Sequence, residues 1–203
     1  SSAVTESRVP GSNEVAVALL TRNPGLAIPS VTADASGRTT VMLKTSGDIP
    51  DLSPLKPLNV SSLAIEGAAG IDWSSLLSLP LEKLALTGCR IDSLPMARTL
   101  LRVKSIDLSG SRITSIDALR LVAALEELSL ANTYVNDISP LAGSRSLRRL
   151  DISGLNPAGL RILSSLPLES LTLSPEALTD LTWVQIVRSH RSLKILRSPN
   201  DPA

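Results

Sequence analysis

One apolar pattern repeats along most of this chain and limits the folds that it can adopt. The pattern is an apolar residue, two variable residues, a second apolar residue, one variable residue and a third apolar residue. Such even self-similarity indicates a solenoid, in which each repeat is one coil that stacks its apolar side chains on the next. The middle apolar residues are spaced 21, 22, 22, 22 and 21 residues apart, at Leu63, Leu84, Ile106, Leu128, Leu150 and Leu171.

Weaker copies of the pattern extend the repeat at both ends. Val41 and Leu43 lie one repeat length before the corresponding residues of the first clear copy, and Leu193 and Ile195 lie one repeat length after those of the last one. We therefore predict six clear coils and two degenerate ones.

Each repeat begins with alternating apolar residues, which is the period of a short β-strand. A second apolar cluster follows on the return path, where segments 51–55 and 137–141 read Asp-Leu-Ser-Pro-Leu and Asp-Ile-Ser-Pro-Leu. Asp or Ser can cap a helical turn, and Pro suits its first position. Because 21–22 residues leave little room for a long helix, we expect short 3-10 or single-turn helices there.

Composition agrees with thin, similar layers. Aromatic residues make up 1% of the chain and Phe is absent, so branched aliphatic side chains must fill the interior. The net charge of +1 gives no electrostatic reason to expect a nucleic-acid partner. No apolar run approaches the roughly 18 residues of a membrane helix, so we expect no membrane insertion in this segment.

The repeat resembles the leucine-rich repeat family in its short bacterial, internalin-like form. Residues 41–195 carry the resemblance, with the text L-x-x-L-x-L-x-x-(N/C/S/T)-x-(I/V). It implies an α/β fold: a right-handed leucine-rich-repeat solenoid with a parallel β-sheet on its concave face, short 3-10 or helical turns on its convex face and an N-terminal helical cap.

The family places an Asn after the strand, where it bonds backbone groups of adjacent coils. We expect small hydroxyl and thiol groups to take over part of that role, and Cys89 to be a buried structural residue. The position is occupied here by Ser46, Ala68, Cys89, Ser111 and Thr133, and then by Leu155 or Asn156.

The chain divides into three regions. We expect residues 1–40 to form an N-terminal cap segment with a helix over 13–22, residues 41–176 to form coils of 21–22 residues, and residues 177–203 to form a C-terminal capping segment. Ser12 or Asn13 can cap the first helix, and Asn-Pro-Gly at 23–25 ends it. The opening residues lack an initiator Met and a signal-peptide pattern, so we interpret them as a processed end or an excised fragment, and they leave the localisation open.

The two ends carry a second, weaker resemblance. The Asn-Pro-Gly at 23–25, the Ser-Pro-Leu of the coils and the closing segment 188–199 are similar to repeat regions attached to some bacterial serine/threonine protein kinases. No kinase motif lies in this chain. The resemblance implies a sensor or scaffold segment detached from a larger protein.

Few residues offer catalytic chemistry. His190 is the single histidine, and one His with one Cys cannot supply the three or four ligands of a zinc site. Phosphate-binding and dinucleotide fingerprints are absent, so we expect no cofactor and no metal. Asp107 and Asp151 would stand roughly 10 Å apart on the sheet, beyond the usual span of paired glycosidase carboxylates. We expect a non-enzymatic chain, and a hydrolase acting through these residues is the least favoured alternative.

A column of alternating charge marks the start of each strand. We expect its neighbours, about 5 Å apart, to pair and to fix the register rather than to bind a ligand. The column consists of Glu82, Lys104, Glu126, Arg148 and Glu169.

The outward sheet positions are small and polar, and tight interfaces usually need larger anchors. We predict that a protein partner binds the charged residues on the concave face together with one exposed aromatic in a loop. These residues are Lys83, Asp107, Glu127, Arg149, Asp151 and Tyr134.

The favoured interpretation is a protein-interaction module, a scaffold or sensor segment of a larger bacterial protein. The alternative is a rigid architectural spacer or cell-surface module without a ligand on this face. The partner's identity and the oligomeric state stay open.

Overall fold

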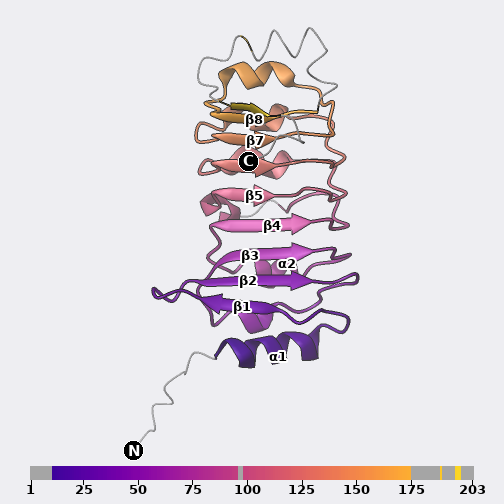
Figure 1. Cartoon of the computed structure of the whole chain (residues 1–203), viewed down its shortest axis with the longest axis vertical. Helices are drawn as coiled ribbons and strands as arrows, with labels where there is room; N and C mark the ends of the chain where they lie inside the picture. Colours follow the sequence, from indigo (N-terminus) through magenta and orange to yellow (C-terminus); the bar gives the residue numbers. More distant parts are fainter. Residues whose placement is uncertain (1–10, 96–97, 175–187, 189–194, 198–203) are drawn as a thin grey trace, which may run out of the picture.

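The computed structural model describes residues 11–95, 98–174, 188 and 195–197. The described residues form a stack of coils whose nine strands follow one another in sequence order across a single sheet (Figure 1). The strands are β1 Ser30–Ala33, β2 Thr39–Lys44, β3 Val60–Glu66, β4 Lys83–Thr87, β5 Ser105–Asp107, β6 Glu127–Ser129, β7 Arg149–Asp151, β8 Ser170–Thr172 and β9 Ile195–Arg197.

Each return path between β2 and β8 carries a short helix, as the repeat length predicts. At two of them, η1 and η4, Pro lies in the first turn, and the preceding Asp51 and Asp137 accept hydrogen bonds from the backbone N–H of Ser53 and Ser139 at 2.8 Å. The helices are η1 Ser53–Leu55, α2 Trp73–Leu76, η2 Arg98–Arg102, η3 Asp117–Leu121, η4 Ser139–Gly143 and η5 Leu160–Ser165.

The interior row of aliphatic side chains is confirmed. The six middle residues of the repeat pair with one another in consecutive parallel strands, from Leu63 with Leu84 to Leu150 with Leu171. All six are at most 3% exposed. The repeat spacing therefore returns the chain to the same interior position in each coil, which makes one continuous core along the stack.

The register expected at the N-terminal end is also confirmed, since Val41 pairs with Leu63. An antiparallel strand was not foreseen. Strand β1 runs opposite to β2, joined by a turn in which the Asp34 carboxylate accepts hydrogen bonds from the backbone N–H of Ser36 and Arg38 at 2.8 and 3.0 Å. Its residues lie mostly exposed, so no apolar alternation marks the strand in the sequence.

The register expected at the C-terminal end is wrong. Leu171 pairs with Leu196 and not with Leu193. The connection to β9 is therefore three residues longer than the prediction assumed, because the last coil exceeds the repeat length. Leu193 and residues 177–187 of the expected capping segment lie outside the described residues.

Helix α1, Ser12–Arg22, packs against β1 at the N-terminal end of the stack (Figure 1) and buries Val15 and Leu19. Its N-cap is Gly11 and not Ser12 or Asn13. The helix starts earlier than expected because the Glu14 carboxylate accepts a hydrogen bond from the Gly11 backbone N–H at 3.1 Å. That contact supplies the cap from within the first turn.

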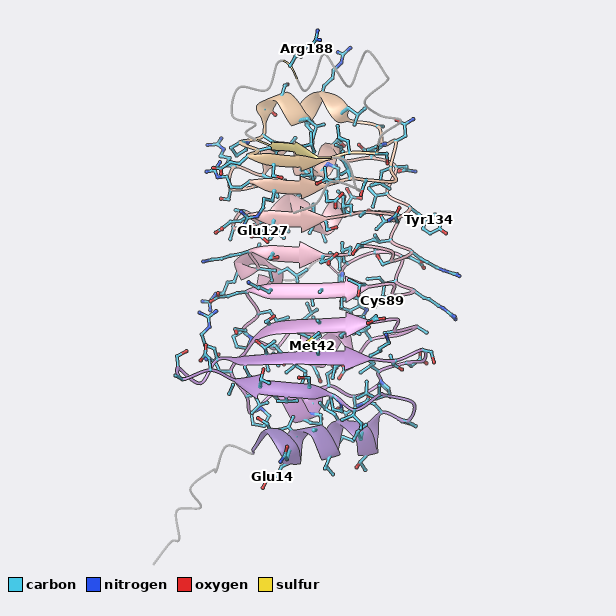
Figure 2. The ribbon with its side chains drawn as sticks, viewed as in Figure 1. Glu14, Met42, Cys89, Glu127, Tyr134 and Arg188 are labelled. Atoms are coloured by element: carbon cyan, nitrogen blue, oxygen red, sulfur yellow. The ribbon has the colours of Figure 1, made fainter. Side chains whose placement is uncertain are left out.

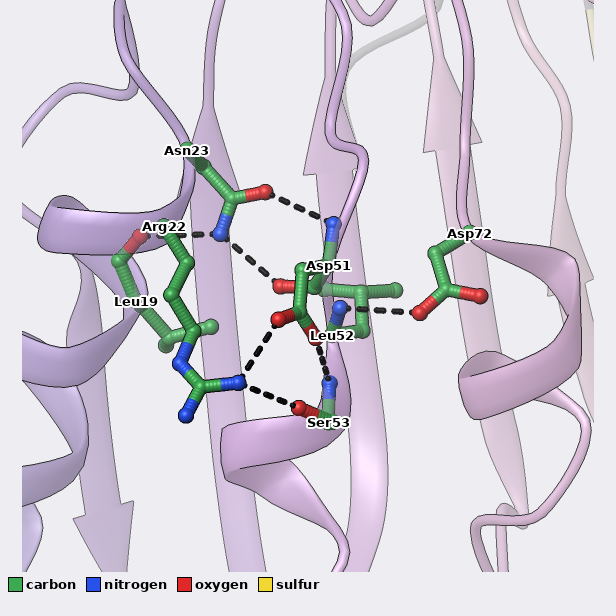
Figure 3. A network of polar contacts seen from close by, with 7 residues as sticks. All are labelled: Leu19, Arg22, Asn23, Asp51, Leu52, Ser53 and Asp72. Atoms are coloured by element: carbon green, nitrogen blue, oxygen red, sulfur yellow. Dashed lines mark hydrogen bonds and ion pairs between the residues drawn. The ribbon is translucent and has the colours of Figure 1, made fainter.

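Asn23 fastens the end of this helix to the first return turn (Figure 3). Its side-chain amide is fully buried and donates to the carbonyl oxygens of Leu19 and Asp51, both at 2.8 Å, while its Oδ1 accepts from the Asp51 backbone N–H at 3.0 Å. Hydrogen bonds from Ser53, together with the Arg22 ion pair at 2.8 Å, lower the pKa of Asp51 to about 2. The N-terminal helix is therefore hydrogen-bonded to the coils and not only packed on them.

The family's Asn position is filled in several ways. The Cys89 thiol is buried and donates to the Ile65 carbonyl of the preceding coil at 3.6 Å, as expected. Ser111 and Thr133 instead donate to carbonyls three residues back in their own coils, at 2.6 and 2.8 Å. Ser46 is exposed, and its neighbour Thr45 occupies the buried position.

A column of left-handed residues follows the strands β3 to β7. A side chain at Gly67 would place its Cβ 2.4 Å from the carbonyl oxygen of Thr45, so only glycine fits there. Asn132, with a φ of 55°, is the one non-glycine residue at positive φ in the described part of the chain. The column comprises Gly67, Gly88, Gly110, Asn132 and Gly154.

Candidate interaction surface

Two rows of outward side chains cross the open face of the sheet, and the strand pairing fixes their members. The start row lies at the beginning of the strands and consists of Thr40, Ser62, Lys83, Ser105, Glu127, Arg149 and Ser170. The middle row lies two residues further along each strand and consists of Met42, Ala64, Ala85, Asp107, Ser129, Asp151 and Thr172, and Thr172 pairs with Arg197 of β9.

Four of the six predicted partner-binding residues line one hollow on this face. Its volume is about 300 Å³, and Asp107, Glu127, Arg149 and Asp151 contribute the charged side chains. We call it the acidic hollow, since three carboxylates face one guanidinium. Lys83 lies outside it, two strands before Glu127 in the start row.

Tyr134 lies at the side of the stack, away from the sheet (Figure 2). It is 66% exposed and follows β6 in the loop that leads to the return path. The structure therefore does not bring it together with the other five residues, and any role of Tyr134 in binding would be on a separate surface.

Glu127 and Arg149 form an ion pair across β6 and β7. Ser105 donates a hydrogen bond to Glu127 from the other side at 3.4 Å. The hydrogen bond with Glu127 raises the pKa of Arg149, and both side chains keep 40% or more of their surface exposed. Within the acidic hollow this pair is neutral, so its net charge of about −2 comes from Asp107 and Asp151.

The two aspartates are held in matching turns. Oδ1 of Asp107 accepts hydrogen bonds from the backbone N–H and the hydroxyl of Ser109, at 2.9 and 2.6 Å. Oδ1 of Asp151 does the same with Ser153, at 2.9 and 2.7 Å. These contacts fix the carboxylates in orientation, and among the described residues the second oxygen of each makes no hydrogen bond or ion pair.

A second hollow lies on the same face over β2 to β4, and sequence reasoning missed it. We call it the apolar hollow. Its volume is about 340 Å³, and Ile28, Met42, Ala64 and Ala85 contribute its apolar side chains. Ile28 is 89% exposed and Met42 is 58% exposed. The alternation through Met42, between two buried residues, could have placed it on the open face.

Comparison with known proteins supports the same architecture. No family model and no curated protein matches this sequence. A solved internalin from Listeria monocytogenes is similar over 74% of this chain and 51% of its own, with a TM-score of 0.57 and 17% identity. Internalin C2 from the same species is similar over 77% of this chain and 80% of its own, with a TM-score of 0.60 and 21% identity.

The chain has the leucine-rich-repeat fold. It spans about half the length of the first of these internalins and about four fifths of the length of the second. At 17% and 21% identity, the similarity applies to the coil architecture and does not extend to a shared ligand.

The alternating charge column lies on adjacent leucine-rich-repeat coils, and Lys104 lowers the pKa of Glu82 after the larger effect of Arg38, but the first three members of the column form no direct ion pairs in the described structure. In the described part of the chain no ion pair joins Glu82, Lys104 and Glu126 to one another. Glu82 pairs with Arg38 of the β1–β2 turn at 2.6 Å, and Arg148 donates to the carbonyl of Pro167 at 3.0 Å. Long exposed side chains gain little from pairing with a neighbour in water, so nearby acceptors compete effectively.

The leucine-rich-repeat coils place few catalytic groups together. The described residues hold no group of three or more His, Cys, Asp or Glu side chains that could bind a metal ion. Burial raises the pKa of the Cys89 thiol, which disfavours the reactive thiolate. His190 lies outside the described residues. None of the described helices is long and apolar enough to cross a membrane.

Proposed function

We propose that this chain is a non-enzymatic protein-interaction module that binds a protein partner on the open face of its sheet. The acidic hollow is the observation that carries the proposal. It gathers Asp107, Glu127, Arg149 and Asp151 from three consecutive strands onto one solvent-facing surface.

The rigidity of this surface supports the proposal. Each strand is hydrogen-bonded to its neighbours, and the side chains of Asp107, Asp151 and Glu127 are each held by local hydrogen bonds. Side chains that are already ordered lose less entropy when a partner binds. A preorganised polar surface on a rigid scaffold is therefore suited to recognition.

The role of such a module in a larger protein, as a scaffold or a sensor, is part of the same proposal. A rigid spacer is the alternative. It would need only the continuous interior of the stack, and it would not need the charged side chains of the hollow to be collected in one place.

Site-specific photo-crosslinking tests the proposal. A photo-reactive amino acid replaces Ser129, at the centre of the acidic hollow, or in a matched protein Lys56, which is exposed at the end of η1 on the return side. Both proteins are irradiated in extracts of the source organism. We expect a discrete adduct from position 129 that excess unlabelled protein competes away, and none from position 56.

A variant that reverses the ion pair serves as the specificity control. Glu127→Lys combined with Arg149→Glu conserves net charge and can form the pair in the opposite sense, so the stack stays folded. We expect the adduct from position 129 to be lost in this background. Equal labelling from positions 129 and 56, or an adduct that survives the reversal, would favour the spacer.

A further inference from the structure

The chemistry of the open face changes in the middle of the sheet. In the middle row, Met42 and two alanines lie over β2, β3 and β4, and a carboxylate first appears at Asp107 on β5. Ala85 and Asp107 are direct neighbours in register. The apolar hollow and the acidic hollow therefore share one row of side chains and one continuous surface.

The apolar hollow has no covering side chain of its own in the described structure. Met42 and Ile28 are both exposed and line the same hollow, so they form a contiguous apolar patch, and the small side chains of Ala64 and Ala85 leave space beside them. Lys44 and Glu66 border this space and neutralise each other in an ion pair at 2.7 Å. An uncharged aliphatic side chain is the complement to such a hollow.

The acidic hollow calls for the opposite charge. Asp107 and Asp151 each keep one carboxylate oxygen free of hydrogen bonds and ion pairs among the described residues, and the one cation in the hollow, Arg149, is already paired with Glu127. An arginine or lysine of a partner could bind the free carboxylate oxygens of Asp107 and Asp151 without breaking the ion pair between Arg149 and Glu127. An acidic partner would meet two carboxylates that no cation in the hollow compensates.

The spacing of the two hollows restricts the partner further. Three strand intervals separate Ala64, which pairs with Met42 in the middle of the apolar hollow, from Ser129, which lies between Asp107 and Asp151. They correspond to about 14 Å at about 4.8 Å per strand. An extended chain covers that distance in about four residues, and side chains four residues apart point to the same side.

From these contacts we infer that the open face binds an extended basic segment of a protein. One aliphatic side chain enters the apolar hollow beside Met42, and an arginine or lysine about four residues away binds between Asp107 and Asp151. The inference rests on the proposed function and adds to it the chemical class of the partner.

Selection from a random peptide library tests the inference without a known partner. Phage-displayed random dodecapeptides are selected on the immobilised full chain. We expect arginine and lysine to exceed aspartate and glutamate in the selected peptides, with an aliphatic residue about four positions from the basic one. Synthetic copies of the selected peptides are then measured by fluorescence anisotropy.

Two sets of variants identify where the peptides bind. Asp107→Asn with Asp151→Asn removes both charges but keeps the Oδ1 acceptors of the two turns, so the fold is retained. We expect affinity to fall about tenfold or more, as for loss of charge-assisted contacts. The charge-matched control, Asp92→Asn with Asp117→Asn, alters two exposed carboxylates of the return path and should leave affinity within about twofold. Met42→Ser should weaken binding of the same peptides.

The outcomes are distinct from those of the crosslinking test. Selected peptides that are acidic or neutral, or that bind the Asp107→Asn/Asp151→Asn variant as well as the unmodified chain, overturn the inference. A failure to select any peptide overturns it too. In each case an adduct from position 129 would leave the proposed function standing, whereas its absence would remove both.

Discussion

The two halves of the sheet share an interior and differ on the surface. Over β2 to β4 the middle row is apolar and the strands are five to seven residues long, while over β5 to β8 the row is polar and each strand has three residues. Behind both halves, the paired interior residues are equally buried. The inward residues therefore stabilise the stack in the same way along its length, while the outward residues alone make the surface of the two halves different.

At β5 and β7, one outward aspartate both adds charge to the surface and caps the end of the strand. Where the middle row holds Ala64 or Ala85, the strand continues for two more residues. Where it holds Asp107 or Asp151, the carboxylate accepts the backbone N–H two residues later and the strand ends there. Aspartate side chains compete with the strand for backbone donors, which accounts for the ends of β5 and β7. Strands β6 and β8 are equally short with the uncharged Ser129 and Thr172 in this row, so a carboxylate is not required for a short strand.

Truncation of an interior leucine should have the largest effect, and the same effect in both halves. Leu63→Ala and Leu128→Ala each remove a side chain that is at most 3% exposed, and each should lower the free energy of unfolding by about 2–5 kcal/mol. Urea unfolding followed by circular dichroism measures this, with Ser129→Ala as a surface control. A clearly larger loss in one half would show that the interiors are not equivalent.

Removal of the Asn23 side chain should affect one half only. Asn23→Ala leaves the Leu19 and Asp51 carbonyls and the Asp51 N–H without their partner, at a cost of about 1–3 kcal/mol. Hydrogen exchange should accelerate in α1 and in β1 to β3, because coils interact mainly with their neighbours. Uniform acceleration through β7 would contradict this and indicate that the stack unfolds as one unit.

The turn at Asp107 should respond to the loss of its acceptor and not to the loss of its charge. Asp107→Ala removes the two hydrogen bonds to Ser109 and should cost about 1 kcal/mol, whereas Asp107→Asn keeps Oδ1 and should stay within about 0.5 kcal/mol. Thermal unfolding of both variants at neutral pH makes the comparison. Equal destabilisation by Ala and Asn would mean that the charge itself stabilises the coil.

The two ion pairs of the face should have the smallest effect. Lys44→Gln breaks the pair with Glu66 in the apolar half, and Glu127→Gln breaks the pair with Arg149 in the acidic half. All four side chains are at least 40% exposed, so each change should cost less than about 1 kcal/mol and less still in high salt. If Glu127→Gln lowered the free energy of unfolding equally at low and high salt, the pair would stabilise the coil by more than a screened charge interaction.

Much of the fold follows from the spacing of the leucines. Period and alternation determine which residues face inward, and so they predict the interior row and the outward rows that contain Asp107, Glu127, Arg149 and Asp151. Strand β1 was not predicted because most of its residues are exposed. For the same reason the exposed Ile28, just before β1, and the apolar hollow that it lines were not predicted either. The register of β9 was wrong because the repeat length changes at the last coil, where pairing moves from Leu193 to Leu196.

Side-chain pairing was less predictable than side-chain position. Glu82 and Lys104 lie on adjacent coils just before β4 and β5, as the charge column predicts, but the ion pair of Glu82 is with Arg38, 44 residues earlier in the chain. The left-handed column could have been found, since Gly67, Gly88 and Gly110 repeat at the spacing of the leucines. Sequence patterns identify faces well, whereas exposed side chains choose partners by small differences in free energy.

The face changes from apolar to acidic between β4 and β5, so the distance between the two hollows depends on the number of coils at that junction. Because β4 and β5 are consecutive parallel strands, a further coil of one repeat length inserted between them would move the two hollows apart by about 4.8 Å, with α1 and β1 still closing the N-terminal end. Proteins lengthened in this way would each prefer a peptide whose aliphatic and basic side chains lie further apart, and the preferred separation would increase by one strand spacing per added coil.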